Sequence, residues 1–104
     1  MPVLGSRAHQ ALIAVLIMAR ESEGLTQREV IPRMPKWLGW IQSTLAKVET
    51  GRRVIAFEEV KALCEVYGTN IAAIEMQADA YEAAMSHPVR VSPPLRTGAT
   101  RKKR

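Results

Sequence analysis

Apolar residues recur every three or four positions through most of residues 1–86, which is the spacing of an α-helix. The run ALIAVLIMA at 11–19 gives a wider apolar arc, so we expect a first helix that is covered on both sides, with Ser6 as its N-cap and Gly24 after its end. Ala, Leu, Ile, Met and Glu dominate this part of the chain and favour helices over strands. The pattern therefore predicts an all-α fold.

The middle of the chain carries clear start and stop signals. The sequence TQRE at 26–29 is a capping box, in which Thr26 and Glu29 each accept a hydrogen bond from the other's amide. Two prolines, at 32 and 35, then interrupt the helix, and Gly39 marks a turn. The spacing of Ile41, Leu45 and Val48 predicts another helix over about 41–50, which the glycine at 51 ends.

Two more helices are predicted, over about 56–67 and 71–85, with Gly68 between them and Thr69 or Asn70 as the cap of the second. The expected buried face of the former comprises Phe57, Val60, Leu63, Cys64 and Tyr67. The latter carries a seam that packs either against the first helix or against a second copy of the chain. We expect the two-fold interface, because the wide arc of the first helix already needs more partner surface than a small bundle offers; the seam consists of Ile71, Ile74, Ala78, Tyr81 and Met85.

Length and charge divide the chain into one domain, 1–86, and a basic tail, 87–104. With 104 residues and 47% apolar content there is room for a single small core. The tail is rich in Pro and Arg and too poor in apolar residues to fold, so we expect it to be disordered and either idle or in contact with a polyanion. The tail carries six basic residues and no acidic one; the basic residues are Arg90, Arg96, Arg101, Lys102, Lys103 and Arg104.

The remaining composition indicates the cellular compartment and the kinds of site that the sequence lacks. The single cysteine, Cys64, has no partner for an internal disulfide and is expected in the core of a cytoplasmic, nucleoid-associated protein. The nine-residue apolar run is too short to span a bilayer, so no membrane association is expected. The sequence shows no nucleophile with a base, phosphate loop or metal-ligand spacing, and His9 and His87 lack the neighbours that ligands need. We therefore expect a non-enzymatic protein without a cofactor or metal.

The helix over 41–50 presents a polar face that suits the major groove of B-DNA. The groove admits one helix, whose first residues lie closest to the base edges. Glutamine can pair with adenine, and hydroxyls can donate or accept single bonds. The predicted base-reading residues are Gln42, Ser43, Thr44 and Lys47, and the predicted backbone contacts are Arg28, Lys36, Arg52 and Arg53. The alternative role of Arg52 and Arg53 is an ion pair with Glu49 or Glu58.

Three blocks of sequence carry a family resemblance, namely LTQREV, GWIQSTLAKVETGRR and FEEVKALCEVYG. Over about 12–74 the chain resembles the helix-turn-helix domain of the Cro and lambda-repressor-like (XRE) transcription regulators, a five-helix DNA-binding fold. The resemblance implies that Gln27 contacts the DNA backbone and braces the reading helix, and that Glu49 and Gly51 form the family's helix-ending Glu-x-Gly. It also implies reading-helix roles for the polar residues from Gln42 to Lys47.

The chain departs from the family at the turn before the reading helix, which is enlarged around MPKWL. Ile31 replaces the usual small alanine, and Ile41 replaces the usual capping serine. We expect Trp37 and Trp40 to pack beneath the longer turn. The alternative exposes Trp37 or Lys36 to the DNA backbone.

Together these features predict a sequence-specific DNA-binding regulator of the phage, prophage or mobile-element type. We expect it to repress transcription as a homodimer on a palindromic operator in double-stranded DNA. The alternative is a protein-binding adaptor, such as an antitoxin or antirepressor, whose DNA binding is secondary. The enlarged turn with two tryptophans, Trp37 and Trp40, and the acidic stretch over 57–82 favour that alternative.

Overall fold

The computed structural model describes residues 2–86, which form five α-helices and, within that range, no strand. The helices are α1 (Arg7–Ser22), α2 (Gln27–Val30), α3 (Gln42–Glu49), α4 (Phe57–Val66) and α5 (Ile71–Ser86), with two short 3-10 turns, η1 (Ile31–Arg33) and η2 (Lys36–Leu38), between α2 and α3. The predicted all-α fold is confirmed. The predicted tail, 87–104, lies outside the described residues.

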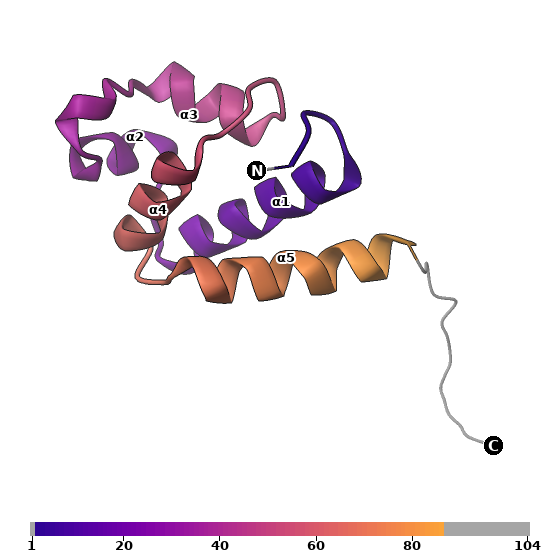
Figure 1. Cartoon of the computed structure of the whole chain (residues 1–104). Coiled ribbons are helices and arrows are strands. Elements are labelled where there is room, and N and C mark those ends of the chain that lie inside the picture. The colour runs from indigo at the N-terminus through magenta and orange to yellow at the C-terminus, as the bar shows by residue number, and fades with distance from the viewer. Residues whose placement is uncertain (1, 87–104) are drawn as a thin grey trace.

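The long helices α1 and α5 lie side by side and antiparallel, while α3 packs against α1 and α2, and α4 packs against α5 (Figure 1). This arrangement explains the wide apolar arc of α1, because one part of it packs against α5 and another against α3. Both sides of the helix are covered, as the pattern predicted. The centre of the core is made by side chains with at most 2% exposure, among them Val15, Leu16, Val30, Leu45, Val48, Ile55, Val60, Leu63 and Ile74.

Local capping sets the helix starts where the sequence placed them. The Ser6 hydroxyl accepts from the amide of His9 at 3.1 Å, and the Asn70 side chain accepts from the amide of Ala73 at 2.8 Å. The Thr26 hydroxyl accepts from the amide of Glu29 at 3.2 Å, and the Glu29 carboxylate accepts from the amide of Thr26 at 2.9 Å. Asn70, rather than Thr69, is therefore the cap of α5.

The two tryptophans of the enlarged turn differ in burial. Pro32 has no amide hydrogen, so α2 ends at Val30. Two separate 3-10 turns, η1 and η2, follow it, and the second ends at Gly39, which has a positive φ of 67°. Trp40 is buried, with 7% exposure, as predicted. The same prediction was wrong for Trp37, whose side chain is 74% exposed.

One expectation about the buried face of α4 is corrected by the structure. Phe57 is 52% exposed, because it is the first residue of α4 and precedes the turn whose side chains reach the core. The rest of the predicted α4 face, including Cys64, is buried. On α5, Ile71, Ile74 and Ala78 pack in the core of the single chain, whereas Tyr81 is 40% exposed and Met85 is half-buried. Most of the predicted seam thus serves the fold itself.

Candidate nucleic-acid interface

The face of α3 opposite the core is polar and open to solvent. Leu45 and Val48 are each 1% exposed and hold the helix against the core, whereas Gln42, Ser43 and Lys47 are exposed. The spacing of the two buried residues leaves the first turn of α3 at the surface. Three of the four predicted base-reading residues therefore share an accessible face.

The fourth predicted base-reading residue, Thr44, has a structural contact. It is half-buried, and its hydroxyl accepts from the amide of Ile41 at 3.3 Å. Ile41 precedes α3 as its N-cap and has no side-chain acceptor for the helix amides. Thr44 thereby satisfies one backbone donor at the start of the helix.

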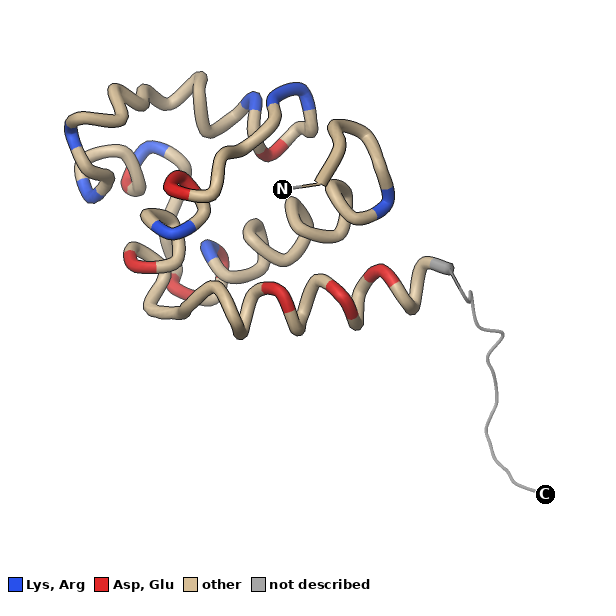
Figure 2. Tube along the Cα trace, in the orientation of Figure 1, with Lys and Arg blue, Asp and Glu red and all other residues tan. Residues whose placement is uncertain are grey.

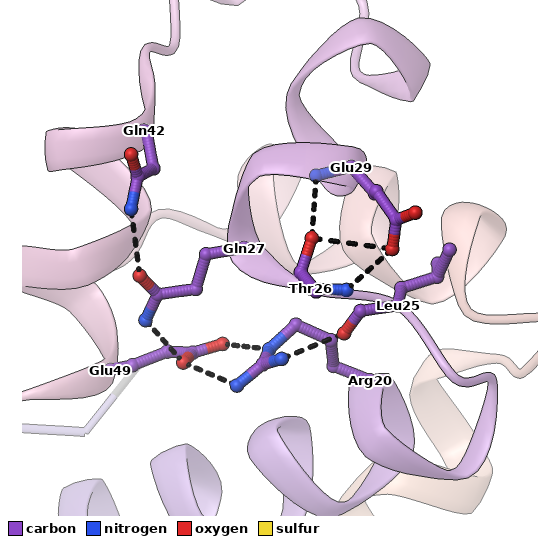
Figure 3. A network of polar contacts seen from close by, with 7 residues as sticks. All are labelled: Arg20, Leu25, Thr26, Gln27, Glu29, Gln42 and Glu49. Carbon is purple, nitrogen blue, oxygen red and sulfur yellow. Dashed lines mark hydrogen bonds and ion pairs between the residues drawn. The ribbon is translucent and has the colours of Figure 1, made fainter.

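A network of polar contacts ties α3 to α1 and α2 (Figure 3). Its centre is Glu49, whose side chain is 7% exposed and lies at the end of α3. Arg20 of α1 donates to both carboxylate oxygens of Glu49, at 2.7 and 3.0 Å, and also to the carbonyl of Leu25 at 2.7 Å. Gln27 at the start of α2 donates to Glu49 at 2.8 Å and accepts from Gln42 at 3.4 Å.

The network holds both ends of α3. Glu49 fixes the C-terminal end through a two-pronged contact with a guanidinium, which specifies angle as well as distance. Gln27 reaches the N-terminal end through Gln42. The expected bracing contact of Gln27 is present, and its partners are the side chains of Glu49 and Gln42.

Sequence reasoning missed Arg20. Its hydrogen bond with Glu49 raises the pKa of the guanidinium above its ordinary value, against the opposing effect of desolvation. The available signal was a cation in the last turn of α1, which also suits the helix dipole and therefore does not identify a distant partner.

A second cluster anchors the loop that follows α3. Arg53 donates to the two oxygens of Glu59 at 3.0 and 2.9 Å, and its guanidinium lies 5.4 Å from the centroid of the Trp40 ring. The indole N–H of Trp40 and the amide of Ala56 also donate to Glu59, at 3.1 and 2.8 Å. Arg53 thus contacts the protein through Glu59, rather than through Glu49 or Glu58, the partners considered in its alternative role.

The carboxylate of Glu59 accepts all of these bonds while only 11% of its side chain is exposed. Burial raises the pKa of Glu59, but the hydrogen bonds from Arg53, Ala56 and Trp40 outweigh burial, so the net pKa lies below the usual range. The ionised form therefore stabilises the folded state above the unfolded-state pKa of about 4.3.

We expect acid to destabilise the domain through Glu59. This contribution is lost as the pH falls through the lowered folded-state pKa, so Glu59→Gln should unfold more easily at pH 7 and show a shallower loss of stability between about pH 5 and 2. Urea unfolding at a series of pH values measures both effects, with Glu58→Gln, at an exposed position of the same helix, as the matched control. Identical pH profiles for wild type and Glu59→Gln would contradict the assignment.

Positive charge lies along the segment from α2 through α3 to the following loop, whereas the only charged positions on α5 are acidic (Figure 2). Arg28, Lys36 and Arg52, which were predicted to contact the DNA backbone, are all exposed. Arg53 is partly exposed, with 35% of its side chain accessible. Positive charge is therefore concentrated in the part of the molecule that includes the polar face of α3.

Within residues 2–86 no group of three His, Cys, Asp or Glu side chains could hold a metal ion. No helix in the same range has the length and apolar character needed to cross a membrane. Cys64 is buried, and burial raises the pKa of its thiol, which fits a core residue.

Comparison with protein families gives a match over residues 11–76 to a family described as a helix-turn-helix domain. Comparisons with curated proteins and with solved structures give no match. The matched residues run from α1 into α5 and include both polar clusters and the exposed face of α3. They cover more than half of the chain. The chain therefore belongs to this helix-turn-helix domain family, which points to a DNA-binding regulator.

Proposed function

We propose that this protein is a sequence-specific DNA-binding transcriptional regulator that inserts the first turn of α3 into the major groove. The proposal rests on one observation above all: Gln42 and Ser43 are exposed at the start of a helix whose other end is fixed by the Arg20–Glu49 pair. A reading helix needs accessible polar groups on a rigid support, because specificity depends on hydrogen-bond geometry. The family of the chain supports the same assignment.

The proposed contacts divide into two classes. Gln42 reads an adenine through paired hydrogen bonds, and Ser43 and Lys47 contact neighbouring base edges. Thr44 presents its methyl group, since its hydroxyl accepts from Ile41. Arg28, Lys36 and Arg52 contact phosphates, which contribute affinity without sequence preference. Arg53 contributes chiefly by holding the loop after α3 in place.

We further propose a repressor of the phage, prophage or mobile-element type that binds a palindromic operator as a dimer. Two-fold symmetry places the two reading helices about 34 Å apart on one face of the DNA. The exposed apolar side chains of α5, Met76 and Tyr81, are candidates for the contact between copies, since Ile74 is buried in the single chain. Footprinting tests symmetry and spacing together, and a single unpaired half-site would contradict the dimer.

Binding-site selection from random duplexes, followed by titration of the selected site and of scrambled DNA, tests the DNA-binding proposal. We expect Gln42→Ala to weaken binding to the selected site by about 1–3 kcal/mol while leaving scrambled DNA unaffected. Arg52→Ala should weaken both DNAs alike and reduce the salt dependence by about one unit of slope.

Gln77→Ala, at an exposed position on α5, is the matched control for removing a surface glutamine amide. A wild-type protein that selects no sequence over bulk DNA would contradict the proposed function. Equal losses on selected and scrambled DNA for Gln42→Ala would contradict the division between base and phosphate contacts.

One observation favours a second candidate function, a protein-binding adaptor. Trp37, Val54 and Phe57 are large apolar side chains that are 74%, 49% and 52% exposed around the enlarged turn and the start of α4. Tryptophan and phenylalanine are enriched at protein interfaces. Purification after nuclease treatment separates the two functions, because an adaptor retains a stoichiometric protein partner when nucleic acid is removed.

A further inference from the structure

Ile41 is an exposed apolar residue at a helix position that usually holds a polar capping side chain. It is the N-cap of α3, with extended backbone at φ −121° and ψ 171°, and its side chain makes no capping bond. Serine, threonine, aspartate and asparagine are preferred there because their oxygen accepts from the first helix amides. The Ile41 residue is 61% exposed and is absent from the hydrophobic core.

The surroundings of Ile41 give this exposed side chain a specific use. The next two residues, Gln42 and Ser43, are the exposed polar residues at the start of α3, so Ile41 lies at the same end of the helix. A lone exposed isoleucine elsewhere on the surface needs no explanation. At the entrance of a reading helix, however, it presents branched apolar surface where the base edges lie closest.

We propose that Ile41 is a specificity-determining residue that recognises the C5-methyl group of a thymine beside the base read by Gln42. This inference rests on the proposed function. The thymine methyl is the apolar group that the base edges present in the major groove, and apolar side chains recognise it by contact. Isoleucine suits this contact because branching at Cβ restricts its side-chain rotamers before binding.

Replacing thymine by uracil tests the proposal, since the two bases differ at this edge by the methyl group alone. After site selection with wild-type protein, each thymine of the selected site is replaced in turn by uracil, and the affinity of each duplex is measured for wild type and Ile41→Ser. We expect one position at which uracil weakens wild-type binding about fourfold, the size expected for one buried methyl group. The Ile41→Ser variant should bind the thymine and uracil duplexes equally at that position.

The Ile41→Ser variant and two further variants separate recognition from folding. Ile41→Ser introduces a favoured capping residue, so it should keep the helical circular dichroism and thermal stability of wild type. Ile41→Val keeps a branched apolar side chain and should retain the preference for thymine. Met18→Ser removes an exposed apolar side chain from α1, outside α3, and should leave the preference unchanged.

The outcomes distinguish this inference from the proposed function. If wild type selects a sequence but tolerates uracil at every position, or if Ile41→Ser keeps the full uracil penalty, the Ile41 assignment is overturned and the DNA-binding proposal stands. If wild type selects no sequence at all, both fall.

Discussion

Replacing Glu49 by alanine is expected to lower the free energy of unfolding by about 3–5 kcal/mol, because it leaves the guanidinium of Arg20 largely buried without its partner. The side chains of Arg20 and Glu49 are 13% and 7% exposed, so water replaces the lost contact poorly. Small domains have a total stability of about 5–15 kcal/mol, so the variant should be close to unfolding. Urea denaturation followed by circular dichroism measures the loss.

Two controls show whether the loss comes from the unpaired charge. Glu75→Ala removes an exposed carboxylate from the middle of α5 and should change the stability by no more than about 0.5 kcal/mol. The double variant Arg20→Met, Glu49→Leu removes both charges and should recover much of the stability, since apolar replacement of a buried pair is often neutral. A double variant as unstable as Glu49→Ala alone would show that the effect does not arise from the unpaired Arg20.

Trp40→Ala is the second large effect that we expect, at about 3–5 kcal/mol of lost stability. The indole is 7% exposed, donates to Glu59 and lies beside the Arg53 guanidinium. Its removal leaves a cavity beneath the enlarged turn and deprives Glu59 of one of its donors. Thermal and urea unfolding of the variant measure the combined loss.

Trp37→Ala is the matched control, because the same side chain is removed three positions earlier from a site that is 74% exposed. We expect a change within about 0.5 kcal/mol for this variant. Trp40→Phe keeps most of the apolar volume and removes the donor to Glu59, so it should fall between the two. Similar losses of stability for Trp37→Ala and Trp40→Ala would contradict the finding that Trp40 is buried and Trp37 is exposed.

Both large effects should also reduce DNA binding, by a route that differs from the loss of a base contact. Glu49 holds the end of α3 through Arg20 and Gln27, and Trp40, which lies just before α3, donates to Glu59 of α4. Their variants should lose affinity for selected and scrambled DNA together, in proportion to the unfolded fraction.

Features set by near neighbours in the chain were predictable from the sequence. The capping box of Thr26 and Glu29 joins residues three apart, and the exposed position of Gln42 follows from the helical spacing of Leu45 and Val48. Such features depend on local backbone geometry and on a periodic pattern, both of which are determined by residues that are close together in the sequence. The all-α fold and the polar face of α3 were predictable for this reason.

The tertiary structure decided which chemically similar residues are buried or paired. The sequence alone treats Trp37 and Trp40 alike, and it offers Arg53 several glutamates as partners, but the packing of the turn over α4 places Trp40 and Arg53 at Glu59. Likewise, Arg20 and Glu49 are 29 residues apart, and only the packing of α1 against α3 brings them within 2.7 Å. Periodicity shows which side of a helix is apolar, whereas a contact between distant residues depends on how the helices are placed in space, to which the whole core contributes.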